Sequence, residues 1–296
     1  MRPRQSLCRA VSSAGIGLHS GKPARLTLRP APPGCGIVFR RLLPGPPVEI
    51  PARVEHLVST RAATVLGRQG ARVGTVEHLL AALVGLGVDD LRIDVEGEEL
   101  PALDGSAAGF VALLHRAGLR RQGHAVEPLR PRHALELQLG TARGRVLPAE
   151  RLGIAYAIDF PHPALGRQRY ELEPVTPAAF EREVATARTF GFLADAEALG
   201  AAGLARGASL ENSVVFGDEA ALGPAGLRWP DEPVRHKLLD LLGDLALLGR
   251  PLAARVEIER GGHALHAALV RALLEQAQLS PGARARAPDR MPWRDR

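Results

Sequence analysis

The sequence has few cysteines, few aromatic residues and no long apolar run. Its 296 residues include only Cys8 and Cys35, which are too few for a disulfide framework or a cysteine-rich metal site and are typical of a reducing cytoplasm. A single optional disulfide between them is left open. The longest nearly uninterrupted apolar stretch, Leu79 to Val88, is far shorter than the ~20 residues that a membrane span requires. No apolar segment follows the N-terminal arginines, so no signal peptide is expected. We therefore exclude a membrane-spanning protein and predict a cytoplasmic one.

Positive charge is carried almost entirely by arginine, because lysine occurs only at Lys22 and Lys237. The 38 basic and 32 acidic residues give a net charge of 38 − 32 = +6. Half of this excess lies between Arg284 and Arg296, so residues 281–296 are expected to form a basic, disordered tail. A peripheral contact of this tail with an anionic membrane is left open. Aromatic residues make up only 4% of the chain, which leaves few stacking platforms, and no nucleic-acid partner is predicted.

Strand-like and helix-like segments alternate and come in a similar order in both halves of the chain. The expected strands are residues 24–28, 36–39 and 90–96 in the first half and 135–139, 153–160 and 253–259 in the second. The expected helices are residues 75–87, 105–118, 177–186, 231–248 and 263–278. Thr75 and Ser106 are the expected N-caps of the first two helices.

This order predicts an α+β fold of two sandwich domains, each with a small sheet packed on helices. The N-terminal domain is expected at residues 1–122 and the C-terminal domain at 130–280, joined by a polar, proline-containing linker at 119–132. No short sequence repeat is visible, so an internal duplication could be recognised only in the structure.

One helix presents a pattern typical of metal ligands. His236, Asp240 and Asp244 are spaced i, i+4 and i+8 within the expected helix 231–248, which stacks them on one face. An imidazole and a carboxylate one turn apart can bind the same cation. The alternative is a helix with solvated acids, in which His236 bonds to Asp240.

Two other segments carry candidate catalytic groups. In Glu77-His78, a histidine ligand beside a carboxylate that is not a ligand would suit metal-assisted hydrolysis. Taken in isolation, the pair is better explained by an exposed Glu77 and a half-buried His78 at a helix start. His263 follows Gly261-Gly262 at a helix start, where it either acts as a general acid or caps the helix. The remaining histidines are interpreted as structural or solvent-exposed: His56, His115, His124, His133, His162 and His266.

Six segments together resemble one protein family. In chain order they are GIGLHSG (15–21), TVEHLLAAL (75–83), LPALDGSA (100–107), ARTFGF (187–192), VRHKLLDLLGDL (234–245) and GGHAL (261–265). Each is weak alone, but their order and spacing over residues 5–275 resemble those of the zinc-dependent UDP-3-O-acyl-N-acetylglucosamine deacetylases of lipid A biosynthesis. The resemblance implies hydrolysis of the N-acetyl group with release of acetate, which is the committed step of that pathway.

The resemblance also implies a metal site and the groups that act beside it. His78, His236 and Asp240 match the zinc ligands, with water in the fourth position, and iron in the cell is left open. Glu77 matches the general base, and His263 matches a cationic general acid that Asp244 orients.

Further positions match substrate contacts of the family. Thr189 matches a hydroxyl that binds the developing oxyanion, Phe190 a contact to the sugar ring, and Lys237 a cation in the substrate site. The family fold has two α+β sandwich domains with the active site between them, and its acyl-passage insert would fall near residues 191–217 here. Arg143, Arg145 and Arg260 are candidates for the lysines that bind phosphate in relatives, and Ala63 stands about where many relatives carry a cysteine near the zinc.

Two alternatives stand beside this interpretation. One is a zinc amidase that acts on another substrate, and the other is a non-catalytic, basic nucleic-acid-binding α+β protein. The joint presence of Glu77, His78, His236, Asp240 and His263 favours a metal amidase, because a binding module has no reason to assemble these groups. The expected partner is a UDP-linked, acylated amino sugar, and a monomer is the expected oligomeric state.

Overall fold

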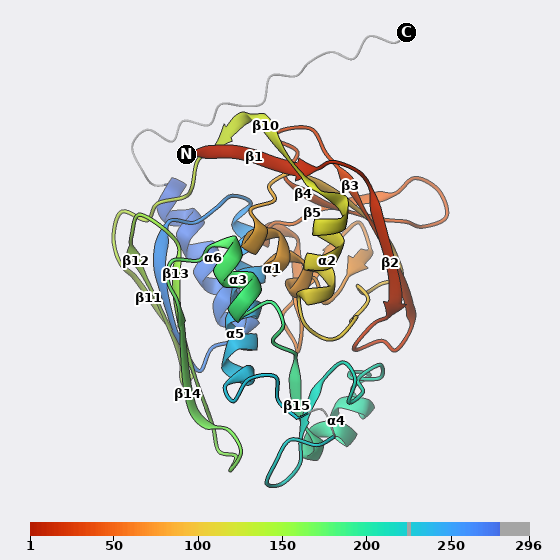
Figure 1. Ribbon diagram of the computed structural model, residues 1–296, viewed down its shortest axis with the longest axis vertical. Coiled ribbons are helices and arrows are strands. Elements are labelled where there is room, and N and C mark those ends of the chain that lie inside the picture. Colours follow the sequence, from red (N-terminus) through yellow and green to blue (C-terminus); the bar gives the residue numbers. More distant parts are fainter. Residues whose placement is uncertain (224–225, 279–296) are drawn as a thin grey trace.

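Two sheets form the outer layers of the molecule, and the main helices lie between them (Figure 1). The computed structural model describes residues 1–223 and 226–278, and the expected tail at 281–296 lies outside the described residues. Among the described residues the helices are α1 (Glu77–Leu86), α2 (Ala108–Ala117), α3 (Pro177–Glu183), α4 (Ala196–Ala201), α5 (Glu232–Leu245) and α6 (His263–Gln278). Short 3-10 helices occur at η1 (Val54–His56), η2 (Leu193–Asp195) and η3 (Ala246–Leu248).

The first five-stranded sheet has the order β2-β3-β9-β4-β5 and the second has the order β11-β12-β17-β13-β14. Their strands are β2 (Val11–Ile16), β3 (Pro23–Pro30), β4 (Ile37–Arg41), β5 (Val48–Pro51), β9 (Leu91–Glu96), β11 (Leu135–Leu139), β12 (Ala142–Pro148), β13 (Gly153–Phe160), β14 (Gly166–Leu172) and β17 (Ala254–Glu259). Smaller sheets contain β1 (Arg2–Leu7), β6 (Leu57–Ser59), β7 (Val65–Arg68), β8 (Ala71–Val73), β10 (Leu119–Val126), β15 (Phe190–Phe192) and β16 (Val214–Phe216).

The two large sheets repeat one topology. In each, the last strand in sequence pairs parallel with the third strand and antiparallel with the second, and the other neighbours are antiparallel. A helix precedes and another follows that last strand, α1 and α2 in the first half and α5 and α6 in the second. The predicted α+β class is confirmed, and the duplication invisible in the sequence is present in the topology. The division into two domains at residues 122 and 130 stays a prediction.

Helix α1 is buried on nearly all sides, which explains why its sequence is apolar all round rather than along one stripe. It packs against α5 between the sheets. The helix begins at Glu77 and ends at Leu86, and the left-handed conformation of the next residue, Gly87 (φ 72°), terminates it. Among residues 1–223 and 226–278, no helix is long and apolar enough to cross a membrane.

The expected N-cap at Thr75 is wrong. Thr75 has a positive φ of 52°, its hydroxyl donates to Glu99 Oε1 at 2.7 Å, and the first turn of α1 has no hydrogen bond to a capping side chain. The cap position belongs to Val76, which has no side-chain acceptor. Ser106 is closer to its expected role, because its hydroxyl accepts from the Ala108 amide at 3.1 Å, although Ala107 occupies the cap position of α2.

The expected linker at 119–132 is also wrong over its first half. Strand β10 pairs antiparallel with β1, so this polar segment joins the N-terminus of the chain to a two-stranded sheet. Arg2 and Arg4 secure β1 by bidentate bonds to Asp89 and Asp90, at 2.6–2.9 Å. A pairing partner more than 100 residues away cannot be inferred from local periodicity, and β10 is mostly exposed, so it lacks an apolar face.

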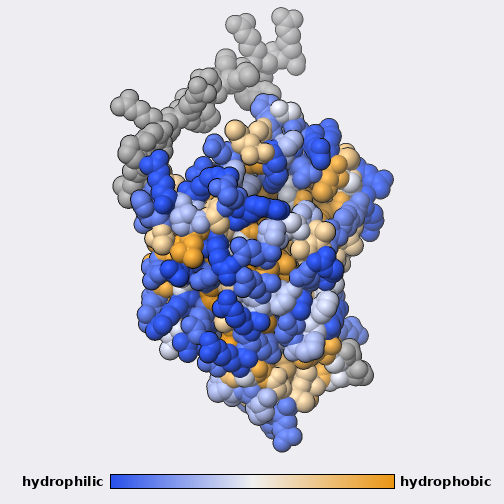
Figure 2. All heavy atoms as spheres, turned by 60° about the vertical axis from the view of Figure 1, so that its left-hand side comes forward, coloured by the Kyte–Doolittle hydropathy of each residue, from blue (hydrophilic) through white to orange (hydrophobic). Residues whose placement is uncertain are grey.

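The second sheet turns a charged face outwards. Leu269 from α6 packs closely against Gly144, so this residue faces the helices. Successive residues of a strand point to opposite faces, and the neighbouring Arg143 and Arg145 therefore point away from the helices. There they line a shallow cavity together with Glu257 and Glu259. The side of the molecule that carries this sheet is predominantly hydrophilic in Figure 2. Such charge alternation conceals β12 and β14 from a search for apolar strands.

The crossing of α1 and α5 depends on Gly243. A Cβ atom at this position would overlap the backbone of Glu77, so only glycine permits the two helices to approach this closely. We expect Gly243→Ala to lower the free energy of unfolding by about 1–3 kcal/mol, because the helices must separate. Urea denaturation measures this change.

Gly200→Ala is the matched control, because Gly200 lies in α4 with no atom near the position of its Cβ. There the same substitution should be neutral or slightly stabilising. Equal stability of the two variants would contradict the proposed close packing at Gly243.

Candidate active site

Helices α1 and α5 bring His78, His236 and Asp240 together at their crossing. All three side chains are buried, and one potential ligand atom from each lies within 4.8 Å of the others. Asp240 Oδ1 lies 3.3 Å from His236 Nε2 and 3.7 Å from His78 Nε2. The two imidazole rings meet edge to face, with centroids 4.9 Å apart. The structure therefore joins two segments that the sequence places about 160 residues apart.

The protonation of the two histidines suits a metal ligand. His236 Nδ1 lies 3.0 Å from the carbonyl oxygen of Ala187, which can only accept, so Nδ1 carries the proton and Nε2 presents its lone pair to the cluster. Burial, followed by the charge of His236, lowers the pKa of His78 to about 3. Burial also lowers the pKa of His236. Both rings are thus neutral near pH 7, as ligation requires.

Asp240 remains an anion beside these neutral rings. Burial works against its charge, but Lys237 and the surrounding histidines outweigh burial and hold the pKa of Asp240 well below its usual range. Lys237 Nζ donates to Asp240 Oδ2 at 2.5 Å, one turn away on α5. The lysine thus holds one carboxylate oxygen, while the other faces the histidines.

These donors fit a single divalent metal ion. Donor atoms that surround zinc tetrahedrally at about 2.0–2.2 Å lie about 3.3–3.6 Å from one another. The observed separations of Asp240 Oδ1 from the two ring nitrogens, 3.3 and 3.7 Å, lie close to this range. Two imidazoles and one carboxylate leave a fourth position open, which is typical of catalytic rather than structural zinc sites.

A second buried cluster lies beside the first and consists of Glu77, His263, Asp244 and Thr64. His263 Nδ1 donates to Asp244 Oδ2 at 2.7 Å, and its Nε2 lies 3.9 Å from Glu77 Oε1. The Thr64 amide donates to Glu77 Oε2 at 3.1 Å, and its hydroxyl donates to Asp244 Oδ1 at 2.5 Å. The two carboxylates are therefore fixed in place, and the imidazole lies between them.

Burial and charge adjust these groups for proton transfer. Burial raises the pKa of Glu77 to about 8; the attraction of His263 opposes this rise and the two aspartates of α5 add to it. Burial disfavours the His263 imidazolium, but Asp244 and Glu77 outweigh burial and raise the pKa of His263 to about 9. Between these two pKa values an ionised Glu77 therefore faces an imidazole that still holds its proton, which is an arrangement for general base and general acid catalysis.

Sequence reasoning missed Thr64, a member of this second cluster, and His266, which contacts the cluster through Asp244. His266, expected to be either structural or solvent-exposed, is buried, and its Nδ1 lies 2.7 Å from Asp244 Oδ2. Its spacing of three residues from His263 on α6 was the available signal, because i and i+3 share a helix face. Thr64 lies in a segment with no recognisable pattern, so nothing in the sequence singled it out.

Thr189 and Phe190, two further predicted site residues, lie just after Ala187, whose carbonyl oxygen contacts His236. The buried Glu232 carboxylate accepts hydrogen bonds from the main-chain amide of Arg188 and from the Arg188 guanidinium, at 2.9–3.1 Å. This ion pair fixes Arg188 next to Ala187, and Phe190 then lies with its ring centroid 6.4 Å from that of His236. Thr189 lies between them and is held by a bond from its amide to the Gly105 carbonyl at 2.8 Å.

Aromatic side chains, scarce elsewhere, gather next to Phe190. Four of the seven phenylalanines and His162 make ring contacts with centroids 5.4–6.4 Å apart: Phe160, Phe190, Phe192 and Phe216. Beside them opens a cavity of about 390 Å³, lined by three of these rings, His162 and two prolines. The segment at 191–217 contributes β15, α4 and β16 to this region.

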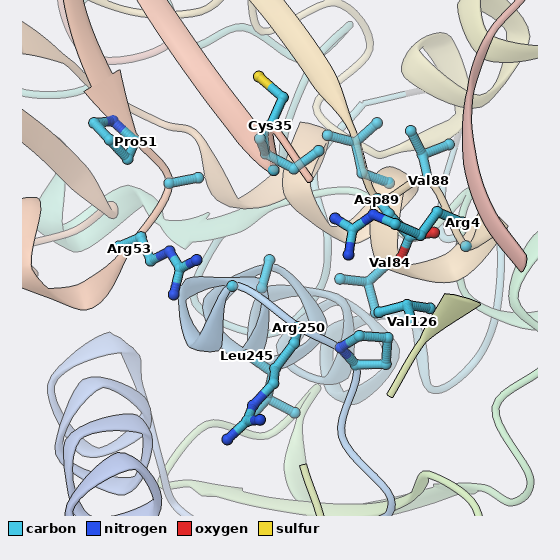
Figure 3. A pocket seen from close by; sticks show the side chains of 18 of the residues that line it. Arg4, Cys35, Pro51, Arg53, Val84, Val88, Asp89, Val126, Leu245 and Arg250 are labelled. Atoms are coloured by element: carbon cyan, nitrogen blue, oxygen red, sulfur yellow. The ribbon is translucent and has the colours of Figure 1, made fainter. Parts of the chain in front are cut away.

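Two other cavities lie near the helices. One of about 320 Å³ reaches His263 from the surface, past Thr60, Ala142 and Gly262. The other, of about 100 Å³, opens near the C-terminal end of α1 and is lined by Val84, Leu245, Arg53 and Arg250, among others (Figure 3). None of the predicted site residues lines the 100 Å³ cavity, so this cavity is separate from the two clusters of the candidate site.

The chain is similar to proteins of one family over nearly its whole length. The family model for UDP-3-O-acyl N-acetylglycosamine deacetylase matches residues 4–275. A UDP-3-O-acyl-N-acetylglucosamine deacetylase of Myxococcus xanthus is 49% identical over 278 residues, which are 93% of this chain and 88% of the relative. Proteins of the same name from Anaeromyxobacter dehalogenans and Oleidesulfovibrio alaskensis are 46% and 45% identical over 271 residues, covering 92% of this chain and 87% and 88% of those relatives.

The Arg188–Glu232 pair should stabilise both the fold and the metal site. We expect Arg188→Met to cost about 3–5 kcal/mol of unfolding free energy, because it leaves the Glu232 carboxylate buried without its partner. The Ala187 carbonyl, one residue before Arg188, would then no longer be held against His236 Nδ1. Loss of this contact should weaken metal affinity about 10- to 100-fold. Urea denaturation and titration against a chelator measure the two effects.

Arg182→Met is the control, since Arg182 pairs with Glu183 at the surface, where an ion pair contributes less than about 1 kcal/mol. If both variants lost the same stability, the buried pair would not be the anchor of this segment.

Proposed function

The chain belongs to the family of UDP-3-O-acyl N-acetylglycosamine deacetylases, and on this premise we propose that the two buried clusters together hydrolyse the N-acetyl group of a UDP-linked, 3-O-acylated N-acetylglucosamine. The observation that carries the proposal is the convergence of three metal-ligating side chains with a facing carboxylate and imidazole. Within this family, the reaction releases acetate and is the committed step of lipid A biosynthesis.

We propose that His78, His236 and Asp240 hold zinc. The family is one of metalloenzymes, and the two neutral imidazoles and the anionic carboxylate are ligands that zinc prefers, while the same donors would accept iron. When bound, the ion would polarise the acetyl carbonyl and lower the pKa of a water molecule.

Glu77 and His263 divide the two proton transfers. As the oxygen of water bonds to the acetyl carbon, the Glu77 carboxylate accepts the proton that water releases. As the carbon–nitrogen bond breaks, the His263 imidazolium donates its proton to the amine nitrogen. Asp244 keeps the imidazolium charged and oriented through the 2.7 Å bond to Nδ1. The products are acetate and the free amino sugar, whose amine takes up the last proton of the acetic acid. Transfer of the proton held by Glu77 to His263 Nε2, 3.9 Å away, restores both residues for the next cycle.

Three residues are proposed to contact the substrate. The Thr189 hydroxyl would donate to the developing oxyanion, because its backbone is fixed between Ala187 and Phe190, both of which touch His236. Phe190 would contact the sugar ring. Lys237 gives one of its three donors to Asp240 and is proposed to offer another to the substrate.

The 390 Å³ aromatic cavity is proposed to accept the acyl chain. It adjoins Phe190 and is formed in part by the insert at 191–217, so an acyl group on the sugar would lie within reach of it. Arg143 and Arg145 lie on the outer face of the second sheet, which argues against both as phosphate ligands, whereas Arg260 remains a candidate.

Other proposed properties follow from the enzyme's class rather than from the site. A cytoplasmic location agrees with Cys8 and Cys35, which are both free thiols. A monomer with no nucleic-acid partner stays a prediction. The membrane contact proposed for the basic tail concerns residues outside the described part of the chain.

Metal content tests the ligand set. Elemental analysis of the purified protein should find about one zinc or iron per chain, and His78→Ala and Asp240→Ala should each lose it, because two protein ligands rarely retain a catalytic ion. His115→Ala is the control, since His115 also pairs with a carboxylate, Glu181, but at the surface. A metal-free wild type that resists reconstitution would overturn the proposal.

Acetate release tests the reaction and the base. We expect the wild type to deacetylate UDP-3-O-acyl-N-acetylglucosamine, and Glu77→Gln to lower kcat by about 10²–10⁴ because the amide cannot accept the proton. The variant should keep its metal, since Glu77 is not among the ligands. A metal-loaded wild type that leaves this substrate intact would favour the amidase with another substrate.

A further inference from the structure

The buried carboxylate of Asp244 is shared between two histidines. Oδ2 accepts from His263 Nδ1 and from His266 Nδ1, both at 2.7 Å, and Oδ1 accepts from the Thr64 hydroxyl at 2.5 Å. Asp244 and His266 are almost completely buried. The proposed reaction uses His263 and Asp244 but leaves His266 without a role.

We propose that His266 is a positioning residue, which holds the Asp244 carboxylate so that His263 is aimed at the reacting amine. This inference rests on the proposed function and extends it to a residue that never touches the substrate.

The Asp244 carboxylate, His266 and Tyr156 form a series of hydrogen bonds, and the donor of each bond follows from what its partner can accept. A carboxylate only accepts, so His266 must carry its proton on Nδ1, and in the neutral ring Nε2 is then an acceptor. The hydroxyl of buried Tyr156 lies 3.0 Å from this Nε2 and is the donor that satisfies it. Burial lowers the pKa of His266, against the attraction of Asp244, which agrees with a neutral ring.

Gly261 contributes to the same arrangement. A Cβ atom at this position would lie 3.0 Å from the Tyr156 hydroxyl oxygen and would also collide with Ile258. The glycine that precedes the His263 helix therefore lets Tyr156 reach His266, which gives the Gly261-Gly262-His263 motif a structural reason beyond the turn.

Asp244, His263 and His266 are joined by hydrogen bonds and do not form a second metal site. Two ring nitrogens and an oxygen that bind one zinc ion would lie about 3.3 Å or more apart. Here both nitrogens lie 2.7 Å from the same carboxylate oxygen, which is the length of a charge-assisted hydrogen bond.

A neutral His266 matters because it orients Asp244 without cancelling its charge. A cationic group in the same position would compete with His263 for the carboxylate and weaken the imidazolium. A neutral N–H donor instead fixes the rotamer and leaves the negative charge for His263. Two donors, from Thr64 and His266, then fix the two oxygens of the carboxylate from different sides.

The test compares His266→Ala with His266→Asn in the metal-loaded protein. Alanine removes the N–H donor, and we expect kcat for acetate release to fall about 10- to 100-fold with KM and metal content unchanged. Asparagine carries an amide N–H near the position of Nδ1, so it should restore most of kcat. His115→Ala, remote and exposed, should behave as wild type.

Several outcomes would overturn the inference. A wild-type kcat in His266→Ala would do so, and so would an asparagine variant as impaired as the alanine variant, which would mean that ring volume matters rather than the donor. If His266→Ala does not fold, Tyr156→Phe is measured instead, since it keeps the ring and breaks the chain one bond further out; there a smaller fall in kcat is expected and no fall refutes the role. A wild type that binds metal but releases no acetate would contradict the proposed function itself.

Discussion

The close crossing of α1 and α5 at Gly243 is the constraint on which the rest of the structure depends. Because no side chain separates the helices there, the Glu77 backbone lies directly against α5, and the next residue, His78, meets His236 and Asp240. A wider crossing would move the ligand atoms out of range of a single ion. The repeated topology explains the symmetry of this arrangement: each helix precedes the last strand of its own sheet, and each half supplies part of the site.

Burial at this crossing lowers the pKa of the histidines in both clusters, but the net result differs between the clusters. Around His78 and His236 it favours neutral rings, which can offer lone pairs to a cation. Around His263 it is outweighed by two carboxylates, so the imidazole holds a proton. Burial and neighbouring charges therefore leave His78 and His236 neutral, as metal ligands must be, and keep His263 protonated a few ångströms away, as a proton donor must be.

Much of what supports these groups comes from outside the two helices. The Ala187 carbonyl sets the tautomer of His236, the Glu232 carboxylate anchors the segment that carries this carbonyl, and Thr64 and His266 hold Asp244. The aromatic cavity adjoins the same segment through Phe190. Positioning, charge and substrate contact thus share one framework, which explains why a change at a remote anchor should reach the metal site.

The family resemblance came from six motifs in order along the chain. The sequence by itself also determined what lies within a few residues: the face shared by His236, Asp240 and Asp244, the Glu77-His78 pair, helices α1, α2, α3, α5 and α6, and six strands of the two large sheets. Local periodicity decides these, because 3.6 residues per turn places such residues on one helix face. Only the tertiary structure decided which distant groups meet. Thr64 lies 180 residues from Asp244, β10 pairs with the first strand of the chain, and Thr75 turns from its expected cap to Glu99. These contacts depend on how the two halves pack, and no local pattern encodes the partner that packing brings near.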